Sequence, residues 1–191
     1  MKIKHFYKET EGENWFNYQN LYSDVVRKFD SGAHFVEVGT WKGKSACYMA
    51  VEIINSEKDI KFDCVDTWEF VKGERIAIHK FDDLFNIFKK NIEPVKNKIN
   101  IIKSISWDAA SRYDDSSLDF VFLDAGHNYE SIKKDIQAWL PKVKVGGILA
   151  GHDWQLKGVK RAVLELIPES KVRTFPLNWS SWEYEKWTER I

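Results

Sequence analysis

The sequence of 191 residues has little cysteine and no excess of charge of either sign. Its two cysteines, Cys47 and Cys64, form no CxxC or CxxxC pattern, which argues against a structural zinc site and a disulfide framework and is typical of a reducing compartment. The 29 basic and 29 acidic residues cancel, whereas proteins dedicated to nucleic acids usually carry a basic excess. No apolar run approaches the roughly 18–20 residues of a membrane span, and no signal-peptide core precedes the first charged stretch. We therefore expect a cytoplasmic protein without nucleic-acid or membrane partners.

Hydrophobic residues make up 43% of the chain and aromatic residues 15%, which is enough for a packed core. The sequence contains only four prolines and no repeat or linker composition. We expect one domain over residues 1–191, with a helical segment in residues 1–32 and the core in residues 33–191. The N-terminal segment is interpreted either as a helix packed on the core or as a lid over a binding site.

Hydrophobic periodicity predicts helices that alternate with strands. The predicted helices cover residues 13–29, 43–54, 76–92, 129–140 and 158–167, with a short helix or turn at 106–113. The predicted strands cover residues 34–38, 60–65, 99–102, 118–123, 145–150, 171–175 and 182–185, the fifth preceded by a Gly-Gly turn. This order favours an open, mostly parallel α/β sheet, which binds ligands at the carboxyl ends of its strands.

A glycine loop, Glu37-Val-Gly39-Thr-Trp-Lys-Gly43-Lys-Ser45, follows the first predicted strand. Its Gly-Lys-Ser ending suggests a phosphate-binding P-loop, but that motif needs four residues between its glycines and only three stand here. The GxGxxG dinucleotide fingerprint is absent. The acid Glu37 instead suits a ligand with a cationic group, and Asp66 after the second strand suits the two hydroxyls of a ribose. S-adenosylmethionine combines these features.

The same residues carry a resemblance to a known family. The loop from Glu37 to Ser45 resembles motif I of the class I S-adenosylmethionine-dependent methyltransferases, and Val65-Asp66-Thr67-Trp68 is similar to their acidic loop. The stretches Leu123-Asp-Ala-Gly-His-Asn-Tyr-Glu130, Trp139-Leu-Pro and Gly146-Gly-Ile-Leu-Ala-Gly-His-Asp-Trp154 resemble the small methyltransferases related to macrocin O-methyltransferase and to proteins labelled cephalosporin hydroxylase. The resemblance covers roughly residues 33–167.

This resemblance implies a Rossmann-like methyltransferase sandwich, with a mostly parallel seven-stranded sheet and helices on both faces. By analogy, Glu37 holds the methionine ammonium, Gly39 and Gly43 admit the cofactor, Ser45 meets its carboxylate and Asp66 binds the ribose. The full set of expected cofactor-binding residues is Glu37, Gly39, Thr40, Gly43, Ser45, Asp66, Thr67, Trp68, Ser106, Trp107 and Asp124.

An acidic and histidine cluster is expected where the fourth and fifth strands end. Asp124, His152 and Asp153 offer the oxygen and nitrogen atoms that suit Mg²⁺ or Mn²⁺. We expect His127 to act as the general base beside Asp124, because an ordinary histidine titrates near working pH. Two plainer interpretations stay open: His127 makes only a local hydrogen bond, and His152 is a structural partner of Asp124 without a metal.

The expected function is therefore transfer of a methyl group from S-adenosylmethionine to a small molecule, an oxygen of a sugar or polyol, assisted by a divalent cation. The alternatives are a P-loop-like NTPase and an S-adenosylmethionine-binding protein without activity. The aromatic C-terminal residues Trp179, Trp182, Tyr184 and Trp187 suit either an edge strand or an interface in a homo-oligomer.

Overall fold

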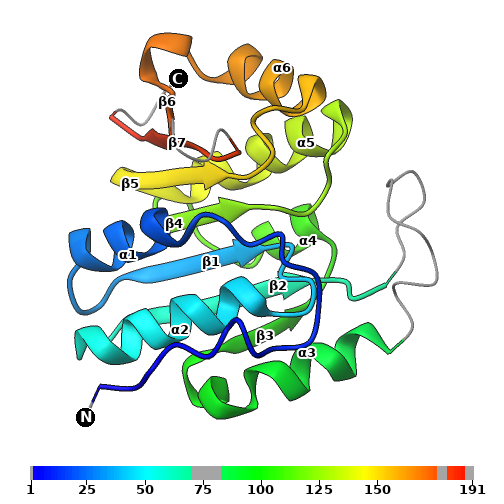
Figure 1. Ribbon diagram of the computed structural model, residues 1–191. Coiled ribbons are helices and arrows are strands. Elements are labelled where there is room, and N and C mark those ends of the chain that lie inside the picture. The colour runs from blue at the N-terminus through cyan, green and yellow to red at the C-terminus, as the bar shows by residue number, and fades with distance from the viewer. Residues whose placement is uncertain (1, 70–82, 176–179, 188–191) are drawn as a thin grey trace.

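A seven-stranded sheet in the order β3-β2-β1-β4-β5-β7-β6 organises the molecule (Figure 1). The structure, a computed structural model, describes residues 2–69, 83–175 and 180–187. The strands are β1 His34–Val38, β2 Lys61–Asp66, β3 Asn100–Lys103, β4 Leu118–Leu123, β5 Val143–Gly151, β6 Arg173–Thr174 and β7 Trp182–Glu185. Strands β1 to β5 pair in parallel, and β7 runs antiparallel to both β5 and β6. The predicted methyltransferase-type sheet is confirmed.

Helices cover both faces of the sheet because successive strand residues point to opposite sides. Phe35, Phe62 and Phe120 pack with helices α1 Gln19–Lys28, α2 Lys44–Ser56 and α3 Leu84–Ile92. Val36, Val65 and Val121 pack with α4 Ser106–Ala110, α5 Tyr129–Trp139 and α6 Lys157–Leu166 on the other face. Short 3-10 turns occupy Glu93–Lys98, Leu140–Lys142 and Glu169–Lys171. The strands are therefore apolar on both faces, as a sheet covered on both sides requires.

The helix predicted over residues 13–29 begins only at Gln19. The residues before it alternate instead: Trp15 and Asn17 are exposed, while Phe16 and Tyr18 are buried. A period of two is the signature of extended chain, and here it sends one set of side chains into the helical layer and the other outward. The aromatic residues of this segment also fit the spacing of an amphipathic helix, which is why the predicted helix begins too early.

Other predicted boundaries differ from the structure or lie partly outside the described residues. Of the helix predicted over 76–92, the described part is α3, Leu84–Ile92, while residues 76–82 lie outside the described residues, as does Trp179. Gly146 and Gly147 do not form a turn before β5 but lie inside it, where the register against β4 shifts between Leu118 and Phe120. The strand predicted over 171–175 shrinks to Arg173–Thr174, because a 3-10 turn holds Glu169–Lys171.

The N-terminal segment is fastened across the helical layer of α2 and α3. Ile3 and Asn55 exchange two hydrogen bonds, of 2.8 and 2.9 Å. The His5 ring stacks on Tyr48 at 4.2 Å between centroids, and its Nε2 lies 2.8 Å from Glu52 Oε1. Figure 1 shows this segment running past α2 toward the end of the sheet where β1 and β4 stop. Within the described residues, no helix has the length and apolar character needed to cross a membrane.

Candidate active site

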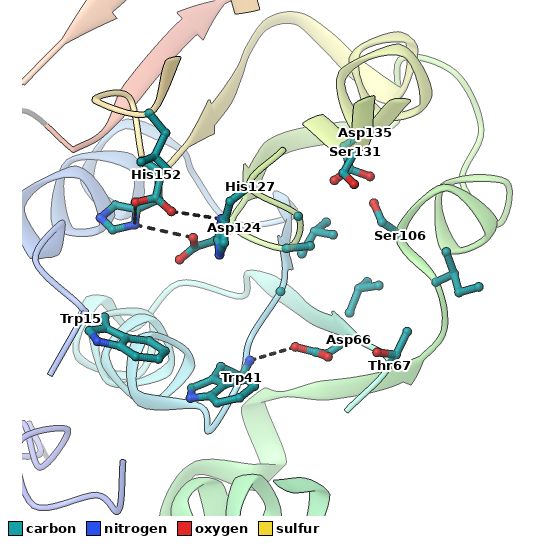
Figure 2. A pocket seen from close by; sticks show the side chains of 18 of the residues that line it. Trp15, Trp41, Asp66, Thr67, Ser106, Asp124, His127, Ser131, Asp135 and His152 are labelled. Atoms are coloured by element: carbon teal, nitrogen blue, oxygen red, sulfur yellow. Dashed lines mark hydrogen bonds and ion pairs between the residues drawn. The ribbon is translucent and has the colours of Figure 1, made fainter. Parts of the chain in front are cut away.

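A cavity of about 630 Å³ opens at the carboxyl ends of β1, β2, β4 and β5 (Figure 2). Its wall includes nine of the residues predicted from the sequence: Gly39, Asp66, Thr67, Ser106, Trp107, Asp124, His127, His152 and Asp153. Open parallel sheets concentrate their ligand sites at this edge, where neighbouring strands stop and their loops diverge. The structure thus brings most of the predicted residues to one cavity of the size that small-molecule sites have.

The two glycines of the loop serve the packing of the chain. Gly39 has φ +88°, and a Cβ added there would lie 2.3 Å from the carbonyl oxygen of Asp124. Gly43 has φ +82° and precedes the first turn of α2, where a Cβ would lie 2.9 Å from the Phe88 ring of α3. Only Gly39 borders the large cavity. The loop can therefore pass close to the end of β4 because it has glycine at Gly39.

Asp66 ends β2 and holds the loops on both sides of it. One carboxylate oxygen accepts a hydrogen bond from the backbone N–H of Trp41 at 2.9 Å, and the other accepts from Trp68 at 2.7 Å. Burial raises the pKa of Asp66, although these backbone donors oppose that effect. Thr67 follows it on the cavity wall. Asp66 therefore shapes the loops and also presents an acceptor to the cavity.

Ser106 and Trp107 begin α4 and line the far end of the same cavity. The Ser106 hydroxyl accepts a hydrogen bond from Trp139 Nε1 at 3.0 Å, and the Trp107 ring lies under Lys134 Nζ, 3.8 Å from its centroid. Ser131 and the buried carboxyl group of Asp135 project toward this end from α5. Sequence reasoning missed both residues, because polar positions on a helix normally indicate a solvated face.

Glu37, Thr40 and Ser45 lie behind the large cavity. Ser45 Oγ donates a hydrogen bond to Glu37 Oε1, and burial raises the pKa of Glu37 to about 8. Among the described residues, Glu37 Oε2 and Thr40 Oγ1 are buried and have no hydrogen-bond partner. Thr40 and Ser45 line a second cavity of about 60 Å³, which shares Trp15, Gly39, Trp41 and Asp124 with the first.

The structure does not place Trp68 at either cavity. Its side chain is buried in the core, with ring centroids 4.8 and 4.6 Å from those of Phe85 and Phe88. Its Nε1 donates to the Trp41 carbonyl at 2.9 Å. Gly43 and Trp68 thus support the glycine loop from behind, and Gly43 does not form the phosphate cradle of a P-loop.

Asp124, His152 and Asp153 converge, each offering one ligand atom, and the three atoms lie within 4.8 Å of one another. His152 Nδ1 is 3.6 Å from both Asp124 Oδ1 and Asp153 Oδ1. Burial alone lowers the pKa of His152, but the carboxylates of Asp124 and Asp153 outweigh it and raise the pKa above its usual value. Two carboxylate oxygens and one imidazole nitrogen form a donor set that suits Mg²⁺ or Mn²⁺.

The N-terminal segment holds this cluster in position. The Tyr18 hydroxyl donates to Asp124 Oδ2 at 3.1 Å. The Asn17 Oδ1 lies 3.1 Å from His152 Nε2 and accepts from Ser180 Oγ at 2.8 Å. A His152 that donates from Nε2 to this oxygen carries its lone pair on Nδ1, the atom that faces the two carboxylates. The sequence offered no signal for these partners except the alternation of Trp15 to Tyr18.

His127 lies beside the cluster. Its Nδ1 is 3.0 Å from Asp153 Oδ2, and this contact lowers the pKa of Asp153, although burial opposes it. An imidazole that donates from Nδ1 to a carboxylate carries its lone pair on Nε2 and is fixed in orientation, which is the arrangement of a general base.

Comparisons with known proteins agree with this geometry. A family model described as a methyltransferase domain matches residues 36–154. The chain is 22% identical over 122 residues to the uncharacterized protein y4gI of Sinorhizobium fredii; the match covers 64% of this chain but only 13% of that much longer relative.

The fold is similar to those of solved O-methyltransferases. NovP superposes with a TM-score of 0.64 at 16% identity, over 89% of this chain and 79% of that one. The calicheamicin methyltransferase CalS11 gives 0.64 at 13% identity, over 87% and 76%. TomG of Streptomyces achromogenes, solved with S-adenosylmethionine, gives 0.62 at 14%, over 88% and 79%. At such identities the likeness shows the fold. The family match spans more than half of the chain, so the chain belongs to the methyltransferase-domain family, the class I enzymes whose methyl donor is S-adenosylmethionine.

Proposed function

We propose that this methyltransferase transfers the methyl group to a hydroxyl oxygen of a small molecule with two vicinal hydroxyls, a sugar or polyol, with a divalent cation at Asp124, His152 and Asp153. The observation that carries the proposal is the convergence of these three side chains on the wall of the cavity that also presents Gly39 and Asp66. In this proposal residues 1–191 form one domain.

The donor side of the cavity fits S-adenosylmethionine. Asp66 offers acceptors for the ribose hydroxyls, and Ser106 and Trp107 border the space for the adenine. Thr40 Oγ1, which is buried without a partner, lines the smaller cavity, where an ammonium group would satisfy it. The buried Glu37 Oε2 also lacks a partner, and we assign it to the same ammonium group. In this arrangement the sulfonium methyl lies near Asp124, between the donor and cation sides.

The cation side fits a hard divalent ion by its donor chemistry. When bound, such an ion lowers the pKa of a coordinated hydroxyl and orients its oxygen toward the methyl group. Tyr18 and Asn17 hold the Asp124 and His152 ligand atoms in place. His127, oriented by Asp153, accepts the hydroxyl proton at Nε2 as the new O–C bond forms. The donor leaves as S-adenosylhomocysteine, so charge and atoms balance.

Two observations support this acceptor class. Two carboxylates and one imidazole leave coordination positions of a divalent cation open for two vicinal oxygens of the acceptor. The fold is also similar to that of CalS11, which is described as a TDP-rhamnose 3'-O-methyltransferase. A pair of neighbouring hydroxyls provides a chelate with the geometry that in-line methyl transfer needs.

Calorimetric titration of S-adenosylhomocysteine into the purified protein, with Mg²⁺, with Mn²⁺ and with chelator, tests the donor site. Binding is expected under all three conditions, because the donor residues and the cation ligands are separate. Methyl transfer to vicinal diols, followed as S-adenosylhomocysteine release, is expected only without chelator. No binding under any condition, or full activity in chelator, contradicts the proposal.

A further inference from the structure

A pair of tryptophans forms one wall of the cavity and has no part in the chemistry described so far. Trp15, from the N-terminal segment, and Trp41, from the glycine loop, lie with ring centroids 6.0 Å apart and planes inclined by 31°. Both border the large cavity. Figure 2 shows Asp124 and His152 on the opposite side of the cavity from the two indoles.

Each indole is held in place by the chain around it. Trp41 adopts φ +50°, a left-handed conformation that bulky residues rarely take and that clusters at ligand sites. Its backbone N–H donates to Asp66, and its Nε1 donates to Glu13 Oε2 at 3.0 Å. Trp15 is 49% exposed, an unusual fraction for so large an apolar side chain. Trp41 packs partly against the core, whereas Trp15 is largely exposed, and the backbone brings both indoles to the rim of the cavity.

We propose that Trp15 and Trp41 are the acceptor-recognition wall, and that the acceptor they select is a pyranose ring. A pyranose presents a face of C–H groups, which packs on an indole, and equatorial hydroxyls at its edge, which suit polar partners. Two of these hydroxyls point toward Asp124 and His152 when the C–H face lies on the wall. The inference rests on the proposed function and assigns it a ring-shaped, polyhydroxylated substrate.

The surroundings of the wall favour a sugar over a flat aromatic diol. The side chains of Asn14 and Asn17 border the cavity next to Trp15, and their amides suit further hydroxyls beyond the chelated pair. A catechol has no further hydroxyls to offer them.

The test compares four acceptors: methyl α-D-mannopyranoside, methyl β-D-glucopyranoside, catechol and glycerol. Binding is measured by saturation-transfer NMR on the protein with S-adenosylhomocysteine and Mg²⁺, and KM by S-adenosylhomocysteine release. The variants are Trp15→Ala, Trp15→Phe and, as a matched control, Trp187→Ala, which removes an indole that is 62% exposed and does not border the cavity.

We expect the pyranosides to bind best and Trp15→Ala to raise their Kd or KM about ten-fold, the loss of one ring contact. Trp15→Phe is expected to retain most of the affinity and Trp187→Ala all of it. Because Trp15 also borders the smaller cavity, the affinity for S-adenosylhomocysteine is measured for each variant and acceptor binding is compared at saturating S-adenosylhomocysteine. The proposed acceptor-recognition wall is contradicted by a preference for catechol, by the absence of saturation transfer to either pyranoside, or by an unchanged Kd in Trp15→Ala. If instead the methyltransferase proposal is wrong, S-adenosylhomocysteine does not bind to the wild-type protein or no acceptor is methylated.

Discussion

Two clusters of histidine and aspartate lie at opposite ends of the same sheet. At the amino end, His34 Nε2 lies 2.8 Å from Asp63 Oδ2, and Tyr113 donates to the same oxygen at 2.6 Å. Asn100 donates to the other oxygen at 3.1 Å. At the carboxyl end, Asp124, His152 and Asp153 border the cavity. The residue types are the same, yet only the second cluster faces space for a ligand.

The two clusters differ in how many hydrogen bonds their carboxylates accept from other protein groups. The carboxylate of Asp63 is buried and accepts from three side chains, so its acceptor capacity is used within the protein. The Asp124 carboxylate accepts from Tyr18, and the His152 Nδ1 is 3.6 Å away, longer than a hydrogen bond. A polar cluster with its bonds made within the protein stabilises the fold, whereas one that keeps acceptor capacity toward a cavity is available for chemistry.

The largest expected effect is that of Asp124→Asn at the carboxyl end. If Asp124 holds the proposed cation, its replacement should lower kcat/KM by about a thousand-fold, since activation by a bound cation is worth several kcal/mol. The free energy of unfolding should change little, because the substitution also relieves repulsion among neighbouring acids. Steady-state kinetics and urea unfolding measure both, with the exposed Asp114→Asn as control. If Asp124→Asn unfolds readily but retains kcat/KM, the cluster at the carboxyl end is structural and the contrast between the two clusters is wrong.

The opposite pattern is expected for Asp63→Ala. It leaves the donors of His34, Tyr113 and Asn100 without their acceptor, which should reduce the free energy of unfolding by about 3 kcal/mol. Well below the melting temperature, kcat/KM should stay at the wild-type value. Urea unfolding and kinetics on the same preparation test this, and a selective loss of kcat/KM would assign the amino-end cluster a functional role.

A smaller effect is expected from Asn17→Leu, which removes the oxygen that orients His152. Partners of this kind typically change metal affinity by about ten- to a hundred-fold, so Mn²⁺ binding should weaken by at least ten-fold while S-adenosylhomocysteine binding stays unchanged. Calorimetry with each ligand measures the split. Asn20→Leu, on the exposed side of α1, is the matched control. Equal Mn²⁺ affinity in the two variants would show that Asn17 does not position His152.

The smallest effect is a pH dependence from Asp63. Its hydrogen bonds with His34, Tyr113 and Asn100 hold the pKa below 3.8, although burial opposes them. For an acid with a lowered native pKa, the unfolded chain binds the proton first. The stabilisation is therefore complete above the unfolded pKa of about 4 and disappears as the pH falls through the native pKa. Urea unfolding between about pH 2 and pH 5 should show a steeper loss in the wild type than in Asp63→Asn. Parallel curves would contradict the assignment.

Much of the fold was predictable because strand periodicity and helix periodicity differ. The runs at 118–123 and 182–185 were predicted with the bounds that β4 and β7 have. The site was predictable where it follows from topology, because Asp66 ends one strand, Asp124 and His152 each follow another strand of the same sheet, and such positions meet at one edge. The predicted helix boundary was wrong at residues 13–18, because the aromatic residues there fit both the helical and the extended spacing.

Side-chain direction in the loop was not predictable. Nothing in the sequence distinguishes Trp41, on the cavity wall, from Trp68, two residues past the end of β2 and packed in the core. Their places depend on which way the glycine loop turns, and that is decided by Gly39 passing the end of β4 and by Asp66 binding Trp41. Such contacts join residues far apart in the sequence.

The N-terminal segment crosses α2 and brings Trp15 and Asn17 to the cavity and the Tyr18 hydroxyl to Asp124, yet it lies entirely outside the residues 36–154 that the family model matches. The proposed acceptor wall thus joins Trp15, from outside the matched residues, to Trp41, from inside them. Substitutions at Trp15 would change the choice of acceptor on an unchanged sheet, whereas Asn17 and Tyr18, which contact His152 and Asp124, connect the same segment to the transfer chemistry. In this segment, substrate choice and catalysis therefore cannot vary independently.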